Sequence, residues 1–264
     1  MRDSPVGVFD SGVGGLTVVK QLMREMPDED IIYFGDTARV PYGTKSPSTI
    51  KKFSIENVLF LLNFNVKIIA CNTSSAIGLP FLSKYFSVPM IGVIKPGAKA
   101  AIRSTRNGRV GVIGTTATIL SKAYENEIKG LDPKIIVYSR DCPLFVPLVE
   151  EGWANDGIVD IAARKYLSPL KEKKIDTVIL GCTHYPLLKT AIQRMMGETV
   201  KLIDSAEETA KEAKNLLEEC GLKYPGKRAG RLKFYVSDAP GKFLMVAKRF
   251  LGKDVKTAKQ VKDV

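Results

Sequence analysis

The amino-acid sequence contains two copies of one unit, one after the other. Three short segments of the first half recur in the second half in the same order. The first two pairs are 104 residues apart, and the third, counted from Cys71 to Cys182, is 111 residues apart. The pairs are 6–11 with 110–115, 31–36 with 135–140, and 67–73 with 178–183. Such a chain is predicted to fold into two similar lobes.

Each recurring segment predicts a β-strand followed by a helix. The segments are short β-branched runs that end in a turn residue. After the segment 6–11, Leu16, Val19 and Leu22 then recur at helical spacing. This alternation predicts an α/β fold with two pseudo-symmetric, doubly wound parallel-sheet lobes and the active site in the cleft between them.

The end of the chain lies beyond the second copy and is expected to return to the first lobe. It contains a strand candidate at 232–236 and a helix candidate at 242–251. If these elements complete the first sheet, the first lobe is 1–95 plus 206–264 and the second lobe is 96–205.

The polar residues that stand out in the sequence follow the predicted strands. They are Asp10 and Ser11, 36–42, Cys71 with Asn72 and Thr73, 115–118, and Cys182 with Thr183 and His184. In open parallel sheets, ligands bind at the carboxyl ends of the strands. Each lobe therefore offers one cysteine to the same cleft.

The net charge of +12 is concentrated near the C-terminus. The segment 223–264 has 12 Lys and Arg against three Asp, a local charge of +9. Because Phe243, Val246 and Phe250 have helical spacing there, we expect an amphipathic helix with a solvated basic face. The alternative is a surface that binds nucleic acid or another anionic partner.

No clean apolar run of about 20 residues suggests a membrane span. Because the N-terminus shows no signal-peptide pattern, a cytoplasmic protein is expected.

Two thiols at strand ends in one cleft limit the reactions that the predicted site can support. In a cytoplasmic chain the cysteines are expected to be reduced, and a thiol at the start of a helix is a better base or nucleophile. A metal site is not expected, because the chain has one His and no second cysteine at ligand spacing from either Cys71 or Cys182. Dithiol redox chemistry and a Cys–His hydrolase using Cys182 and His184 remain open. Proton transfer at a carbon from both faces uses both thiols and the duplication.

The glycine-rich turn at 12–15 is not a dinucleotide fingerprint, because position 17 is Thr where the pattern needs Gly. It is expected to be a tight strand-to-helix turn whose amide groups bind a carboxylate.

Several segments together resemble the glutamate racemases, cofactor-independent enzymes of the aspartate/glutamate racemase superfamily. The segments are 8–16, 33–43, 70–76, 142–152 and 180–187. The resemblance implies interconversion of L- and D-glutamate without pyridoxal phosphate or another cofactor, supplying D-glutamate for peptidoglycan. It makes Cys71 and Cys182 the two acid/base residues.

The resemblance also implies roles for the neighbours of the two cysteines. Asp10 assists Cys71, and Glu150 and His184 assist Cys182. Substrate contacts fall on Asp10, Ser11, Tyr42, Gly43, Asn72, Thr73, Thr183 and His184, with Thr115 and Thr118 as weaker candidates. Cys142 and Cys220 are expected to be structural.

Other functions remain open at this point. An aspartate racemase, or a racemase for another amino acid, would differ in the depth of the pocket. A non-catalytic protein that binds a macromolecule through its basic C-terminal segment would leave the paired thiols unexplained. The expected partner is the small-molecule substrate, neither nucleic acid nor a membrane is expected, and a homodimer is left open.

Overall fold

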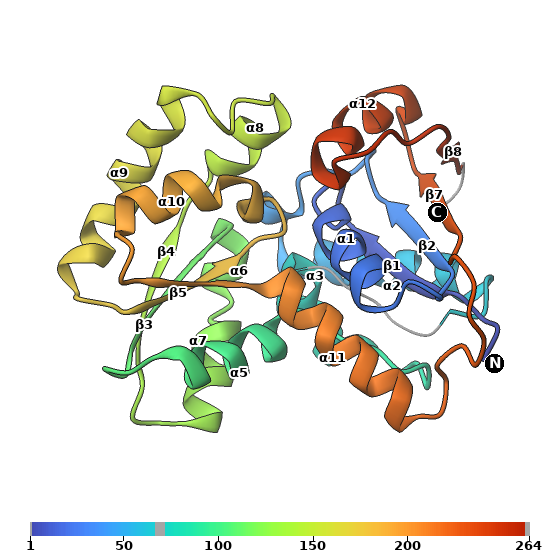
Figure 1. Ribbon diagram of the computed structural model, residues 1–264, viewed down its shortest axis with the longest axis horizontal. Helices are drawn as coiled ribbons and strands as arrows, with labels where there is room; N and C mark the ends of the chain where they lie inside the picture. Colours follow the sequence, from blue (N-terminus) through green and yellow to red (C-terminus); the bar gives the residue numbers. More distant parts are fainter. Residues whose placement is uncertain (1, 67–71, 262–264) are drawn as a thin grey trace.

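Two parallel β-sheets form the centres of two lobes that lie side by side (Figure 1). The computed structural model describes residues 2–66 and 72–261. The strands are β1 (Val6–Asp10), β2 (Ile31–Gly35), β3 (Arg109–Gly114), β4 (Ile136–Asp141), β5 (Thr177–Gly181), β6 (Lys201–Asp204), β7 (Leu232–Val236) and β8 (Lys259–Gln260). In the described part of the chain, the first sheet has the order β1, β2, β7, β8 and the second β4, β3, β5, β6, with every neighbouring pair parallel.

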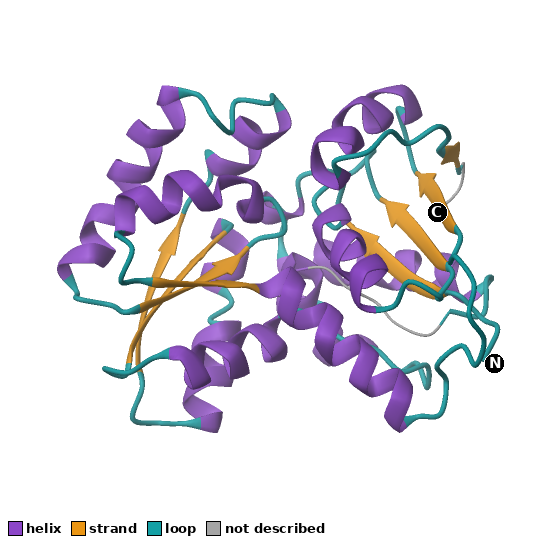
Figure 2. Cartoon of the chain, in the orientation of Figure 1, coloured by secondary structure: helices purple, strands orange, loops and turns teal. Residues whose placement is uncertain are grey.

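Helices cover both faces of each sheet (Figure 2). The helices are α1 (Leu16–Glu25), α2 (Pro47–Leu62), α3 (Asn72–Ile77), α4 (Leu79–Leu82), α5 (Ile94–Ser104), α6 (Thr116–Leu120), α7 (Ala123–Leu131), α8 (Phe145–Glu150), α9 (Gly157–Glu172), α10 (Lys189–Met196), α11 (Ser205–Glu219) and α12 (Pro240–Leu251), with short 3₁₀ turns η1 (Tyr42–Thr44) and η2 (Tyr185–Leu188). In the second lobe, α9 and α10 pack together on one face of the sheet, and α5 and α7 on the other (Figure 1). The predicted fold of two doubly wound lobes is confirmed.

Strand β2 shows why these sheets are covered on both sides. Its residues Ile31 and Tyr33 lie in the hydrophobic core that includes side chains of α1 and α12, whereas Ile32 and Phe34 lie in the core beside α2. Successive side chains of a strand point to opposite faces, so an uninterrupted apolar strand must be buried on both.

The duplication is visible in the packing of equivalent glycines. Gly7 of β1 and Gly111 of β3 occupy matching positions in the two copies. A Cβ atom on Gly7 would lie 2.7 Å from Cβ of Val66, and one on Gly111 would lie 2.4 Å from Cδ1 of Ile175. Val66 and Ile175 each lie shortly before the third recurring segment of their copy, at 67–73 and 178–183. In both lobes the glycine leaves room for this side chain. In the first lobe, the strand predicted at 67–71 lies outside the described residues.

The C-terminal part of the chain returns to the first sheet, as predicted. Strand β7 pairs in parallel with β2, with Leu232 opposite Ile31, and α12 packs against α1. Helix α11 lies between the lobes and contacts both α1 and α5 (Figure 1). The exact boundaries at 95/96 and 205/206 stay a prediction.

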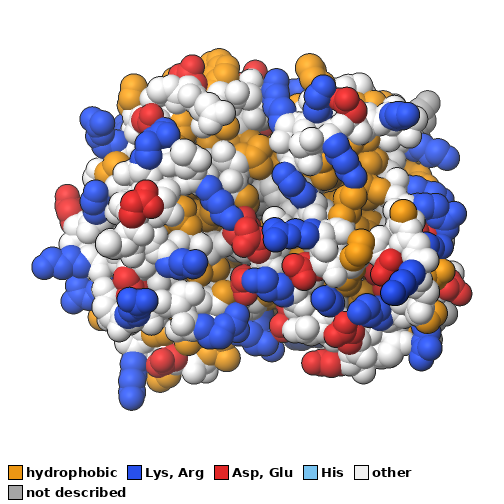
Figure 3. Space-filling view, viewed as in Figure 1, with side chains coloured by type: hydrophobic (Ala, Val, Ile, Leu, Met, Phe, Trp, Pro, Cys, Tyr) orange, Lys and Arg blue, Asp and Glu red, His pale blue; other side chains and the backbone are white. Residues whose placement is uncertain are grey.

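Charged side chains are spread over the surface. Figure 3 shows Lys and Arg over both lobes on one face of the molecule, with Asp and Glu among them. Helix α12 buries Phe243, Val246 and Phe250 and exposes Lys248 and Arg249, as expected of an amphipathic helix. Of the helices in 2–66 and 72–261, none is both long and apolar enough to cross a membrane.

Candidate active site

A cavity of about 370 Å³ lies between the lobes, at the carboxyl ends of both sheets. The first lobe contributes Asp10, Ser11, Val40, Pro41, Tyr42, Gly43 and Thr44, and the second contributes Thr115, Thr116, Pro143, Val146, Pro147, Glu150, Cys182, Thr183 and His184. The strand-end turns of both copies therefore meet at one site, as the sequence predicts.

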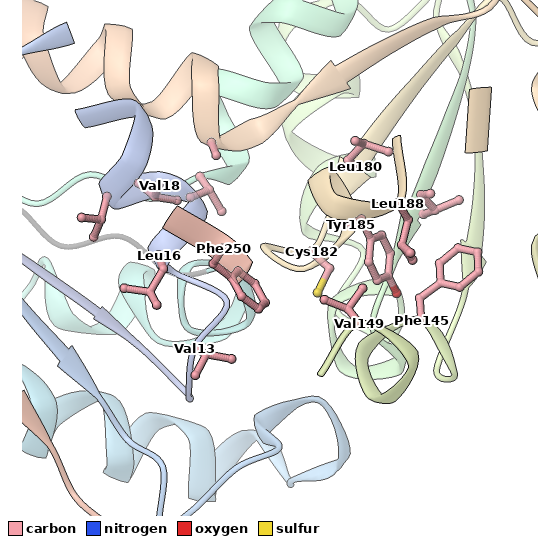
Figure 4. Close-up of a cluster of buried hydrophobic side chains, with 14 of the residues drawn as sticks. Val13, Leu16, Val18, Phe145, Val149, Leu180, Cys182, Tyr185, Leu188 and Phe250 are labelled. Atoms are coloured by element: carbon pink, nitrogen blue, oxygen red, sulfur yellow. The ribbon is translucent and has the colours of Figure 1, made fainter. Parts of the chain in front are cut away.

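Cys182, His184 and Glu150 form a chain of polar contacts along one wall of the cavity. The sulfur of Cys182 lies 3.9 Å from Nδ1 of His184, and Nε2 of His184 lies 2.8 Å from Oε1 of Glu150. Cys182 and His184 are both buried, with 5% and 4% of their surfaces exposed. Figure 4 shows the Cys182 side chain at the boundary between the lobes, with Val13 and Phe250 of the first lobe across from it.

The electrostatics of this chain favour an ion pair. Burial alone would lower the pKa of His184, but its contacts with Cys182 and Glu150 raise it to about 10. Burial would raise the pKa of Glu150, and the hydrogen bond and charge of His184 lower it. At neutral pH the imidazole is therefore protonated and Glu150 ionised, so an imidazolium N–H faces the sulfur of Cys182.

The local fold holds these side chains on the cavity wall. Cys182 directly follows the buried strand β5, and its carbonyl accepts a hydrogen bond from the amide of Tyr185 in turn η2. The hydroxyl of Tyr185 donates to the carbonyl of Cys142 at 2.9 Å. That bond fixes the turn to the segment leading into α8, which carries Glu150.

The glycine-rich turn after β1 binds a carboxylate, but the carboxylate is the chain's own Asp10. The amide of Gly15, just before α1, donates to Oδ2 of Asp10 at 2.8 Å. The predicted binding of a carboxylate by an amide of this turn is thus seen with a side chain of the chain itself. Binding of a ligand carboxylate by the other amides of the turn stays a prediction. Asp10 also lines the cavity, so it is both a helix-end partner and a site residue.

The same turn brings the two lobes into direct contact. A Cβ atom on Gly14 would lie 2.2 Å from Oγ1 of Thr183 and 2.5 Å from Nδ1 of His184, so only glycine permits this approach. The hydroxyl of Thr17 lies 2.9 Å from the carbonyl oxygen of Thr183, to which it donates. The glycines thus support the turn that carries Thr183 and His184.

Tyr42 lines the cavity, yet its hydroxyl is directed to a buried network. It donates to Asp36, which also accepts from Nε of Arg39 at 2.7 Å and from the hydroxyl of Ser237 at 2.9 Å. The side-chain amide of Asn57 donates to the Tyr42 hydroxyl at 3.0 Å. Burial, and then the charge of Asp36, raise the pKa of Tyr42. The network fixes the loop that presents Tyr42 and Gly43.

Other predicted site residues have different outcomes. Cys71 lies outside the described residues, and Asn72 and Thr73 open helix α3. Gly43 meets the second lobe, because a Cβ atom there would lie 2.9 Å from Cβ of Thr115. Thr115 lines the cavity, whereas Thr118 is buried beside it without lining it.

The cavity wall also contains residues that sequence reasoning missed. Val40, Pro41 and Thr116 lie in the predicted turns 36–42 and 115–118, whereas the missed residues are Thr44, Pro143, Val146 and Pro147. The last three belong to the segment 142–152, which carries part of the family resemblance, so that segment was the available signal.

The thiols of the remaining described cysteines do not line the cavity. Cys142 and Cys220 are free thiols, the first buried and the second exposed. Burial, and then the neighbouring Asp141, raise the pKa of Cys142, which keeps it a thiol. In the part of the chain that the structure describes, no group of three or more His, Cys, Asp and Glu side chains could hold a metal ion.

A family model described as Asp/Glu/Hydantoin racemase matches residues 13–213. The chain belongs to this racemase family. A glutamate racemase from Geobacter metallireducens is 53% identical to it over 249 residues, which cover 94% of this chain and 92% of the relative.

Solved racemase structures share the fold over nearly the whole chain. A glutamate racemase isoform from Bacillus anthracis superimposes with a TM-score of 0.94 at 40% identity, covering 99% of this chain and 98% of that one. A glutamate racemase from Francisella tularensis, solved with D-glutamate, gives a TM-score of 0.93 at 44% identity with the same coverage. The resemblance is confirmed, and the chain is an amino-acid racemase, an isomerase.

Proposed function

We propose that this racemase interconverts L- and D-glutamate by proton transfer between two cysteines and Cα, without pyridoxal phosphate, and that it supplies D-glutamate for peptidoglycan. The substrate follows from the relatives, which are glutamate racemases, one of them solved with D-glutamate. The observation that carries the proposal is the chain from Cys182 through His184 to Glu150, which opens on a cavity between the lobes.

The cavity has the chemistry to bind a small amino acid. Asp10, Glu150 and His184 are its charged lining residues within the described part of the chain, and Lys and Arg do not line it there. The two substrate carboxylates are therefore held by hydroxyl groups, such as those of Ser11 and Thr183, and by backbone amides. Asp10 and Glu150 offer negative charge for the substrate ammonium.

Cys182 serves one face of the substrate. Its thiolate takes the proton from Cα, and the electron pair of the broken C–H bond remains on a planar carbanion. A thiol on the opposite face then gives its proton to Cα, which inverts the stereocentre. Family resemblance assigns that second thiol to Cys71, and assigns Cys71 to D-glutamate deprotonation and Cys182 to the L-enantiomer.

His184 supplies a charge for the sulfur during this cycle. The protonated imidazole, held by Glu150, places an N–H donor next to the thiolate before the transfer. The chain Cys182–His184–Glu150 thus keeps the sulfur in a polar setting although the residue is buried.

The experiment is circular dichroism of the purified protein with L-glutamate. We expect the optical activity to decay to zero, at full rate in EDTA, with no pyridoxal absorbance in the protein. L-aspartate is the matched control, because its side chain is one methylene shorter. A difference of one methylene changes transition-state binding by about 1–3 kcal/mol. Optical activity that stays constant with glutamate, or decays faster with aspartate, would overturn the proposed substrate.

A further inference from the structure

Helix α12 of the first lobe reaches the Glu150–His184 pair of the second lobe. Nη1 of Arg249 donates a hydrogen bond to the carbonyl oxygen of Glu150 at 2.8 Å. The ring of the next residue, Phe250, meets the ring of His184 edge to face, with centroids 5.4 Å apart and an interplanar angle of 89°. Two consecutive residues of α12 thus contact both members of the pair.

The backbone after α8 is shaped to receive the Arg249 guanidinium. Gly152 has φ +86°, a left-handed conformation that favours glycine. A Cβ atom on Gly152 would lie 2.7 Å from Cζ of Arg249. The guanidinium therefore lies directly over this glycine while it binds the Glu150 carbonyl. A cation at the carbonyl end of a helix is also favoured by the helix dipole.

We infer that Arg249 is a positioning residue, which holds the backbone of Glu150 across the interlobe boundary so that the Glu150 side chain keeps His184 aligned with Cys182. Phe250 packs against the imidazole from the same helix. The inference gives a role to the basic C-terminal segment, and its catalytic part rests on the proposed function.

Charged groups near the pair come from both lobes. Glu150 and Cys182 contact His184 directly, and the charge of Lys242 in α12 acts on Glu150. Asp10 lines the same cavity from the first lobe. Lys248 precedes Arg249 but forms its ion pair with Asp254, so it provides a matched control of equal charge.

The first test measures the pKa of His184 directly. His184 is the only histidine of the chain, so its imidazole resonances in an NMR titration need no assignment. We expect Arg249→Gln to lower this pKa by about one unit, a tenfold change in proton affinity. In Arg249→Lys, the pKa of His184 should lie between the values of the wild type and of Arg249→Gln. In Lys248→Gln, it should equal the wild-type value. This readout needs neither turnover nor Cys71.

The second test separates the two half-reactions. Because enantiomers have equal free energies, kcat/KM in the two directions stays equal in every variant, so this quantity cannot reveal an asymmetry between the two half-reactions. N-hydroxyglutamate can: after the Cα proton is removed, a C=N bond forms and the N–O bond breaks, releasing hydroxide. Cys182→Ser identifies the enantiomer of the analogue that Cys182 deprotonates.

We expect Arg249→Gln to slow elimination from that enantiomer about tenfold and to leave the other nearly unchanged, since misalignment affects only the half-reaction of Cys182. An unchanged His184 pKa, or equal loss with both enantiomers, would overturn the inference. If Cys182→Ser instead retains racemisation, the two-cysteine proposal fails, whatever the NMR titration shows. Thermal unfolding of each variant identifies any loss that comes from misfolding.

Discussion

The two lobes present the same edge of the same kind of sheet to the cavity, but with different chemistry. In the first lobe, Asp10 at the end of β1 accepts a hydrogen bond from the amide of Gly15. Asp36, just after β2, is bonded to Tyr42, Arg39 and Ser237. Its carboxylates are engaged in holding loops.

In the second lobe, the corresponding edge carries a thiol, an imidazole and a carboxylate. Cys182 and His184 follow β5, and Glu150 lies at the end of α8. The two copies therefore share strands and turns, whereas the described side chains at the turns differ between β1 and β2 of the first lobe and β5 of the second. Among the described residues, those of the first copy shape the cavity wall, and those of the second place a thiol, an imidazole and a carboxylate on it.

The largest expected effect comes from removing the thiol of the second lobe. Cys182→Ser should reduce racemisation by about 10³-fold or more, because a hydroxyl is a far weaker acid/base group than a thiol. Circular dichroism with either enantiomer measures the loss. Cys71→Ser should have an equal effect if the lobes contribute one base each.

Cys220→Ser is the control, since this thiol is exposed and away from the cavity, and it should retain the wild-type rate. In deuterated water, the product should carry deuterium at Cα from the first turnover while the remaining substrate stays protiated. Heavy early deuteration of the substrate would point to a single base and contradict the division of labour between lobes.

Glu150→Gln should reduce activity about 10²-fold and change how stability depends on pH. The raised pKa of His184, about 10 against about 6.5 unfolded, stabilises the protein fully below pH 6.5, and this contribution is lost as the pH rises toward 10. The lowered pKa of Glu150 contributes stability above its unfolded value, lost as the pH falls. Wild-type protein should therefore lose stability as the pH rises from about 6.5 toward 10, because His184 holds its proton more tightly in the folded than in the unfolded state.

Urea unfolding at several pH values measures that slope, and Glu150→Gln should flatten it. Glu151→Gln, a change at the adjacent exposed carboxylate, should leave it as in the wild type. A slope equal in all three proteins would show that the pair is not coupled to folding.

In the first lobe, Asp36→Asn should act on the loop and not on the chemistry. Asp36 is fully buried, and the amide leaves its Arg39 and Tyr42 partners poorly matched. We expect the free energy of unfolding to fall by about 2–3 kcal/mol and KM to rise more than kcat falls. Asp238→Asn, at an exposed carboxylate of the same lobe, should change neither. If Asp36→Asn lowered kcat and left KM unchanged, Asp36 would take part in the reaction, as the second-lobe residues do, and the prediction would be wrong.

The smallest effect is expected at a helix cap. Thr115 accepts a hydrogen bond from the amide of Thr118 at the start of α6, and Ser46 accepts one from Thr49 at the start of α2. Thr115→Ala and Ser46→Ala should each cost about 1 kcal/mol of stability in urea unfolding. Only Thr115 lines the cavity, so only its variant should also lose a few-fold in kcat/KM. Equal kinetics in both would mean that Thr115 is structural.

Sequence reasoning reached the fold and the polar part of the site because both have local signals. The carboxyl ends of parallel strands lie at one edge of a sheet, so the residues that follow each strand are predicted to share one cleft. Asp10, Tyr42, Cys182 and His184 were predicted in this way, and all line the cavity.

The parts that were missed depend on tertiary packing. Pro143, Val146 and Pro147 form an apolar wall, and an apolar wall has the same sequence pattern as a core. The binding of Asp10 to Gly15 depends on how tightly the turn closes. Lys248 and Arg249 are adjacent and equally basic, and only their directions from α12 show which one reaches Glu150.

The return of β7 to the first sheet has a consequence for synthesis on the ribosome. Strand β7 pairs with β2 only after about 200 further residues have been made, a delay of about 10–40 seconds at 5–20 residues per second. Strands β3 to β6 emerge within that interval as one continuous run, so the later lobe is free to close first. Until β7 arrives, one edge of β2 lacks its partner, a condition that favours pairing with other chains. Because α12 follows β7, a nascent chain lacks Arg249 and Phe250 beside its histidine until the first lobe closes.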